Sequence, residues 1–445
     1  MASVSGPGVN CQPAPNAGTR DCDAALLATS IGGYNRPRVA TNRLPGFAAM
    51  TLPLEHVRVL DLSRVLAGPY CTMLLGDLGA DVIKVERPGT GDDTRQWGPP
   101  FVGGESAYFL CCNRNKRSVT VNLKSPRGQD LVRELASRSD VVIENFLPGT
   151  LESVGLGWDD LSRLSSRLVF CSITGFGQTG PRRDEPGYDI MIQGRTGMMS
   201  ITGEPDGPPM KVGVAISDIT AGLFAANAIL AALLARERTG RGERIDISLL
   251  DCTVAWLANV GSSYLVSGEV PRRHGNAHPN IVPYQAFEAA DISLIVAVGN
   301  DSQFQRFCQV IDRPDLATDT RFTTNALRVA NRVELLPVVA AALRQRPAAD
   351  WLSAFAQAEV PAGPVNTIDR VFQDPQVIAR DMVWAVPHPT AGELKMVGTP
   401  QKFACSDASP RRPPPLLGEH TAAILHDMLG LSDVEVGQLR SQGVI

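Results

Sequence analysis

Short apolar runs alternate with helical patterns along the first half of this chain. The apolar runs predict strands at residues 57–62, 81–86, 140–144 and 168–173. Helices are predicted to open at Ala67-Gly68-Pro69 and at Ser125-Pro126, because proline suits the first turn of a helix. Strands that alternate with helices in this way form parallel sheets covered on both faces. The pattern therefore predicts an α/β protein with a mainly parallel sheet.

A long, nearly uncharged segment at residues 219–235 directly follows Asp218. It is barely long enough for a membrane span and contains Gly222, so it is interpreted as a buried helix of a large soluble protein. An apolar run at residues 212–216 precedes Asp218. Asp218 then lies at a helix N-terminus, where an aspartate commonly caps the helix or occupies its first turn. A desolvated aspartate can also serve as a nucleophile.

The pattern restarts near Tyr284, with a strand predicted at residues 294–298 and a helix at residues 328–344. A further helix is predicted at residues 421–429. Chains of this size usually fold into more than one domain. The predicted parts are a large domain at residues 51–276 and 386–445, a smaller domain at residues 277–385, and an N-terminal extension at residues 1–50.

The extension is rich in Gly, Pro, Ser and Asn and lacks periodicity, which predicts a disordered or targeting segment. Its arginines weakly resemble those of a mitochondrial transit peptide, whereas Asp21 and Asp23 argue against one. Met50 as the true start is a third possibility.

Charge and motifs exclude several classes of function. The net charge of -4 comes without a basic face, so nucleic acid is not an expected partner. The six histidines lack metal-ligand spacing, and no metal is predicted. No G-x-G-x-x-G motif follows the first predicted strand, and the sequence contains neither a P-loop motif nor the serine-hydrolase motif. The nine cysteines contain no Cys-x-x-Cys pair, which fits a reducing compartment.

Several segments between Leu54 and the C-terminus form a recognisable series when they are taken in order. They are residues 59–62, 66–69, 79–88, 115–118, 142–146, 148–149, 239–242, 275–277 and 415–421. This series resembles the class III CoA-transferases, the family of formyl-CoA transferase and carnitine CoA-transferase.

The resemblance implies a large Rossmann-like domain built from both chain ends, a smaller inserted α+β domain and an interlocked homodimer. It implies no tightly bound cofactor, with a coenzyme A thioester and a small carboxylic acid as substrates. Asp218 matches the family's nucleophile, which follows a short apolar strand and precedes a long helix. In the family this aspartate forms a mixed anhydride and then an aspartyl-CoA thioester. A cytoplasmic enzyme without membrane contact is expected, with the mitochondrial matrix as the alternative location.

The family's CoA contacts can be carried over onto positions mostly at or beyond the carboxyl ends of predicted strands, where open α/β sheets bind ligands. Arg87 and Lys124 could instead be solvated surface charges, and Phe146 could belong to the core. The contacts implied by resemblance are Leu66, Ala67, Arg87, Asn122, Leu123, Lys124, Asn145, Phe146 and Tyr188.

Residues 91–95, 97–101 and 278–284 are most similar to the succinyl-CoA:glutarate and related dicarboxylate CoA-transferases. A dicarboxylate needs a cation for its remote carboxylate. The candidates are Arg95, Arg114 and His278, although His278 could instead cap a backbone group. The glycine-rich loop of formyl-CoA transferase is missing at residues 275–280, which argues against formate and oxalate.

Two other functions are compatible with the same fold. An acyl-CoA racemase needs an acid/base pair. Related racemases place a histidine where this chain has Tyr188, and tyrosine is a poor base at neutral pH. A CoA-binding protein without catalysis is the third possibility, and the intact Asp218 argues against it.

Overall fold

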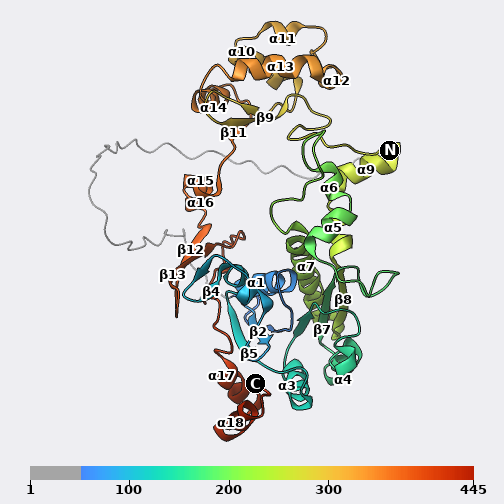
Figure 1. The fold of residues 1–445 in the computed structure, drawn as a ribbon, viewed down its shortest axis with the longest axis vertical. Coiled ribbons are helices and arrows are strands. Elements are labelled where there is room, and N and C mark those ends of the chain that lie inside the picture. The colour runs from blue at the N-terminus through green and yellow to red at the C-terminus, as the bar shows by residue number, and fades with distance from the viewer. Residues whose placement is uncertain (1–51) are drawn as a thin grey trace, which may run out of the picture. The chain divides into compact units, whose positions relative to one another are not determined.

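A computed structural model describes residues 52–445 of the chain (Figure 1). The predictions for residues 1–50, including the alternative start at Met50, lie outside the described residues.

A six-stranded parallel sheet forms the framework of the fold (Figure 1). The strand order is β5-β2-β1-β6-β7-β8, and every neighbouring pair is parallel. The chain moves outward from β1 to β5, then returns to the other side of β1, so a topological switch point lies between β1 and β6. The α/β prediction is confirmed. The strands are β1 (Arg58–Asp61), β2 (Asp81–Glu86), β5 (Lys116–Thr120), β6 (Val141–Glu144), β7 (Val169–Thr174) and β8 (Glu243–Ser248).

Successive residues of the central strands point to opposite faces of the sheet, and each face has its own core. Val59 packs with helices α1 (Ala67–Asp77) and α7 (Ile216–Thr239) on one face. Leu60 packs with α3 (Pro126–Ala136) on the other face. The central strands β1, β2, β6 and β7 therefore carry apolar residues on both faces, which is why their positions could be predicted.

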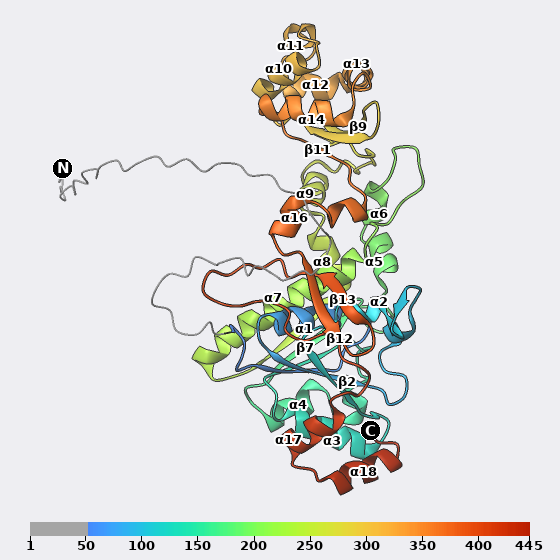
Figure 2. The same cartoon turned by 90° about the vertical axis from the view of Figure 1, so that its left-hand side faces the viewer.

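The C-terminal end of the chain contributes helices to the large part and no strand to its sheet. Helix α17 (Thr421–Leu429) lies beside α3, and its Ile424 joins the core of that face (Figure 2). Helix α18 (Asp433–Ser441) adds Val436 and Leu439 to a smaller apolar cluster with α17.

Helix α7 is longer than the predicted segment, and its buried residues Ala221, Ala225 and Ile229 face α1 and the sheet. By length and composition alone it could cross a membrane, as could the bent pair α8 (Leu249–Ala255) and α9 (Ala258–Ser267) if the pair formed one span. The short strand that the resemblance implies before Asp218 is not formed. Residues 212–215 have no regular structure, because the Val212 N–H donates to the Gln193 side chain, 2.9 Å away, instead of to a neighbouring strand.

Residues 282–362 build a second core of their own around a three-stranded antiparallel sheet, ordered β11-β10-β9. The helix predicted at residues 328–344 is two helices, because the Asn331 side chain donates to the carbonyls of Leu327 and Arg321 at the junction. The elements are β9 (Tyr284–Glu288), β10 (Ser293–Ala297), α10 (Asp301–Val310), α11 (Asp315–Thr318), α12 (Asn325–Ala330), α13 (Arg332–Leu343), α14 (Ala348–Gln357) and β11 (Ala362–Pro364).

A hairpin of β12 (Val383–His388) and β13 (Gly392–Val397) follows, so the boundary predicted at residue 385 falls inside a strand. The remaining short elements are η1 (Asp93–Gln96), β3 (Phe101–Val102), β4 (Glu105–Ser106), α2 (Ala107–Leu110), η2 (Glu152–Val154), α4 (Trp158–Leu164), α5 (Asp189–Arg195), α6 (Met198–Ile201), α15 (Ile368–Val371) and α16 (Pro375–Ala379).

Candidate active site

The N-terminus of helix α7 is capped by a residue other than Asp218. Ala215 precedes the helix and has no side chain that could cap it. The Asp189 carboxylate, at the start of α5, accepts a hydrogen bond from the Ser217 N–H at 2.8 Å. Its other oxygen accepts from the Gln193 side chain at 2.7 Å. Because Asp189 caps the helix, Asp218 in the first turn is not needed as the cap.

The Asp218 carboxylate has no hydrogen-bond donor or cation as a partner among residues 52–445. Burial, and secondarily the nearby Asp189 carboxylate, raise the pKa of Asp218 to about 7. A carboxylate that has lost its hydration and has no counter-ion is a stronger nucleophile in its ionised form. Asp218 thus has the electrostatic environment expected of a nucleophile near neutral pH.

The surroundings of Asp218 are largely apolar. Leu66 of the β1–α1 turn belongs to one cluster with Tyr108, Ala215 and Ile219. Burial, followed by the charge of Asp218, raises the pKa of Tyr108 to about 12, so its phenol stays neutral. The Tyr108 ring packs edge-on against Trp97, with 5.1 Å between centroids. Apolar surroundings of this kind limit the access of water.

Helix α7 crosses α1 one turn after Asp218, at Gly222. A Cβ atom on Gly222 would lie 2.7 Å from the Ala67 carbonyl oxygen and 3.1 Å from the Tyr70 ring. Only glycine permits this approach. The crossing brings the start of α1, with the predicted CoA contacts Leu66 and Ala67, beside the turn that carries Asp218.

A cavity of about 570 Å³ lies at the carboxyl ends of β1, β2, β5 and β6. This is the switch point of the sheet, where open α/β folds bind ligands, and the volume suits a small-molecule site. Five of the predicted contacts share this cavity, together with Arg64, which the sequence analysis missed. The shared predicted residues are Arg87, Asn122, Leu123, Lys124 and Phe146.

Two arginines of this cavity share one carboxylate. Arg64 pairs with Asp93 at 3.2 Å, and Arg87 pairs with the same side chain. The Arg64 guanidinium lies 5.1 Å from the Phe146 ring centroid, and its buried Nε has no hydrogen-bond partner among residues 52–445. Lys124 is exposed and has no ion pair within the described part of the chain. The sequence signal for Arg64 was its place in the turn that follows the strand predicted at residues 57–62.

Comparison with known proteins decides the family. The sequence profile of CoA-transferase family III matches residues 54–421, most of the chain. The chain belongs to this family. A succinyl-CoA:glutarate CoA-transferase of Mus musculus is 47% identical over 393 residues, covering 88% of this chain and 90% of the relative. A succinate–glutarate CoA-transferase of Agrobacterium fabrum is 48% identical over 382 residues, covering 84% and 96%.

Solved structures agree with the family assignment. A CaiB/BaiF family protein from Brucella suis superposes with a TM-score of 0.77 at 47% identity, covering 84% of this chain and 99% of that one. A Mycobacterium tuberculosis protein superposes with a TM-score of 0.75 at 34% identity, covering 84% and 99%. The protein is therefore a CoA-transferase whose substrates are CoA thioesters.

Two cations predicted to bind a substrate carboxylate are already paired in this CoA-transferase. Arg95 contacts Glu86 at 2.7 and 2.8 Å and Glu105 at 3.0 Å. Arg114 contacts Asp77 at 2.6 Å, with both side chains buried. Because the chain itself neutralises both guanidiniums, their predicted substrate role has no support in the geometry.

His278 and Tyr188 also lie outside the cavity lining. His278 Nδ1 accepts the Asn280 N–H at 3.0 Å, which is the backbone-capping role considered from sequence. Tyr188 precedes α5 and is 62% exposed. An exposed phenol is no substitute for the histidine of the related racemases, and the curated relatives described above are transferases by name. The racemase alternative therefore has no support.

Proposed function

We propose that this CoA-transferase moves CoA from succinyl-CoA to glutarate or a dicarboxylate of similar length, with Asp218 as the covalent nucleophile. The mechanism rests on the state of the Asp218 carboxylate. It is partly buried and has neither a hydrogen-bond donor nor a counter-ion as a partner in the described chain. The substrate pair is supported by the names of relatives that are 47–48% identical.

The first half-reaction transfers CoA from the succinyl group to the Asp218 carboxyl group. The ionised Asp218 oxygen attacks the thioester carbonyl of succinyl-CoA, a C–O bond forms and the C–S bond breaks, giving a mixed anhydride and the CoA thiolate. The thiolate then attacks the Asp218 acyl carbon, so that succinate leaves and an aspartyl-CoA thioester remains. No proton is gained or lost.

The second half-reaction runs the same steps in reverse order. A glutarate carboxylate attacks the aspartyl-CoA carbonyl and displaces the thiolate, which forms an aspartyl-glutaryl anhydride. The thiolate attacks the glutaryl carbonyl, and glutaryl-CoA leaves with Asp218 restored. Both intermediates are hydrolysable, so the apolar surroundings formed by Leu66, Tyr108 and Ile219 serve to exclude water.

The nucleotide end of CoA is assigned to the cavity at the switch point of the sheet. Arg64, Arg87 and Lys124 are the accessible cations there, whereas Lys84 also lines the cavity but is buried and paired with Asp92. Guanidinium groups suit phosphate oxygens. The start of α1 links this cavity to the turn that carries Asp218, so the pantetheine arm would pass Leu66 and Ala67. The N-terminal end of α1 adds a partial positive charge along that path.

An interlocked homodimer is part of the proposal and rests on the family resemblance. Apolar residues on α9, Leu265 and Val266, are 82% and 89% exposed in the single chain, and a partner chain would cover such side chains. Sedimentation of the full chain tests the dimer.

The proposed location is the cytoplasm, with the mitochondrial matrix as the alternative.

A product assay tests the function. The protein is incubated with succinyl-CoA and glutarate, and CoA esters are identified by mass spectrometry. Glutaryl-CoA and succinate are expected in equal amounts, and Asp218→Ala should form neither. Deuterium uptake at an α-carbon without exchange of acids would indicate a racemase. Tight CoA binding with no turnover by the unmodified protein would indicate a CoA-binding protein.

A further inference from the structure

The turn between β1 and α1 holds a residue in a conformation that its side chain disfavours. Val65 has a φ of +69°, in the left-handed region. A β-branched residue rarely adopts this region, and such conformations persist only where the surroundings enforce them. The turn borders the cavity through Arg64 and leads directly into Leu66 and Ala67.

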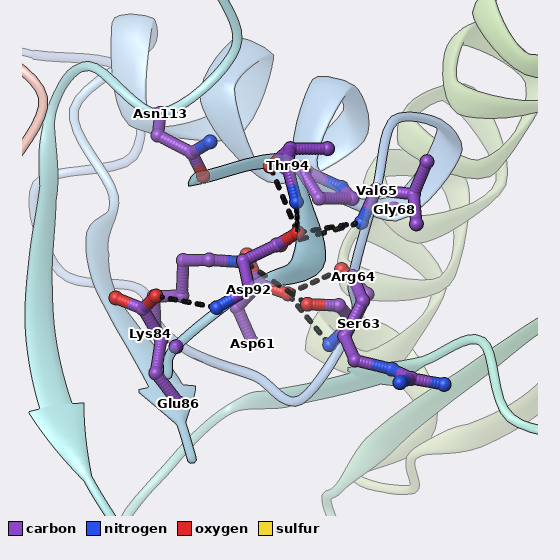
Figure 3. Close-up of polar contacts among 12 residues, drawn as sticks. Asp61, Ser63, Arg64, Val65, Gly68, Lys84, Glu86, Asp92, Thr94 and Asn113 are labelled. Carbon is purple, nitrogen blue, oxygen red and sulfur yellow. Dashed lines mark hydrogen bonds and ion pairs between the residues drawn. The ribbon is translucent and has the colours of Figure 1, made fainter. Parts of the chain in front are cut away.

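A buried ion pair supports one side of this turn (Figure 3). Lys84 and Asp92 contact each other at 2.9 Å, and both side chains are fully buried. Lys84 also donates to the Ser63 carbonyl at 3.0 Å, and Asp92 accepts from the Val65 N–H at 3.3 Å. The pair therefore fixes the backbone on each side of Arg64.

Asn145, directly after β6, supports the other side of the turn. Its Oδ1 accepts the Arg64 N–H at 2.8 Å, and its Nδ2 donates to the Arg64 carbonyl at 2.7 Å. Both ends of the amide are thus bonded to one residue across the switch point. Although the resemblance implied that Asn145 contacts CoA, its amide is already engaged with the backbone of its own chain.

We propose that Asn145, Lys84 and Asp92 are positioning residues, which act on CoA through the backbone of the β1–α1 turn. They impose the left-handed conformation of Val65, and this conformation directs Arg64 into the cavity and sets the start of α1 beside Asp218. The inference rests on the proposed function in one respect, that CoA binds in this cavity.

A double-mutant cycle separates positioning from direct contact. Glycine adopts positive φ without strain, so Val65→Gly should make the support by Asn145 unnecessary. We expect Asn145→Ala to weaken CoA binding about tenfold, and Asn145→Ala combined with Val65→Gly to recover to within about threefold of the unmodified protein. Titration calorimetry with CoA alone gives the Kd.

Asn331→Ala is the matched control, because it also removes an asparagine amide that bonds to backbone carbonyls. It should leave the Kd for CoA unchanged. Asn145→Asp, which keeps the shape and the acceptor for the Arg64 N–H, replaces the alanine variant if the latter fails to fold. It should weaken CoA binding and recover with Val65→Gly in the same way.

Two results would overturn the inference. Weak binding by Asn145→Ala that Val65→Gly does not restore would identify a direct CoA contact. A lowered Tm with an unchanged Kd, and unchanged KM and kcat, would identify a purely structural role. Because CoA binding is measured without turnover, a protein that binds CoA but fails to convert glutarate overturns the proposed substrates and leaves this test intact.

Discussion

Asp189 caps the helix whose first turn carries Asp218, and it also raises the pKa of Asp218. The same carboxylate thus relieves Asp218 of a structural role and makes it more basic. In most helices an acidic residue in the first turn is itself stabilised by the helix N-terminus. Here Asp189 makes the capping hydrogen bond instead of Asp218.

The pH dependence of kcat/KM should report the ionisation of Asp218. With a pKa of about 7, activity should rise with pH through neutrality as the carboxylate ionises. Asp189→Asn keeps an oxygen for the Ser217 N–H but removes the charge, so the rising limb should shift to lower pH. A limb that stays in place in Asp189→Asn would contradict the electrostatic role of Asp189.

Asp218→Asn should change stability in a pH-dependent way. The folded pKa of Asp218 is raised above its unfolded value of 3.8, so the folded state binds the proton more tightly. The contribution of Asp218 to stability should therefore decrease as pH rises from about 4 to about 7 and level off above, and comparison with the Asn variant isolates this contribution. The Tm advantage of the Asn variant should grow by about 1–3 °C over that window. An advantage that shrinks with rising pH would contradict the assignment.

Gly222→Ala should disturb the crossing of α1 and α7. The added Cβ would meet the Ala67 carbonyl at 2.7 Å, and such overpacking costs about 1–3 kcal/mol of unfolding free energy. Activity should fall as well, because the start of α1 moves relative to Asp218. Gly437→Ala in α18 is the control, since its Cβ would meet no atom within 4 Å. Chemical denaturation of both variants measures the difference, and equal stabilities would argue against the close crossing.

Arg64→Met should weaken the use of full-length CoA esters selectively. If Arg64 binds a phosphate, KM for succinyl-CoA should rise about tenfold, whereas a succinyl-pantetheine thioester should be used as before. Arg163→Met, at an exposed arginine with a side chain 73% accessible, should change neither value. An equal effect of Arg64→Met on both thioesters would place Arg64 outside the phosphate site.

The sheet could be predicted from sequence where its strands are apolar on both faces, as in β1, β2, β6 and β7. Strand β5 was missed because it begins with Lys116, whose buried ammonium pairs with Asp61 at 3.2 Å. A sequence shows the charge of Lys116 and not the partner, which is 55 positions away. Strand β8 was missed for a related reason, since its apolar residues alternate with charged ones.

The location of the site residues could be predicted from sequence better than the role of each residue. Residues at the ends of strands do line the cavity, because parallel strands bring their carboxyl ends to one edge. Arg95 and Arg114 seemed to be free cations because their partners Glu86 and Asp77 are distant in sequence or belong to other elements. The left-handed Val65 left no sequence signal, because a valine gives no hint of positive φ.

Chemical trapping of Asp218 tests the central claim most directly. The protein is mixed with succinyl-CoA alone, quenched with hydroxylamine or borohydride, digested and examined by mass spectrometry. The account predicts a hydroxamate or a reduced alcohol on the peptide that contains Asp218, with release of succinate, and no such product from Asp218→Asn. An unmodified Asp218 peptide from protein that converts succinyl-CoA and glutarate at full rate would contradict it.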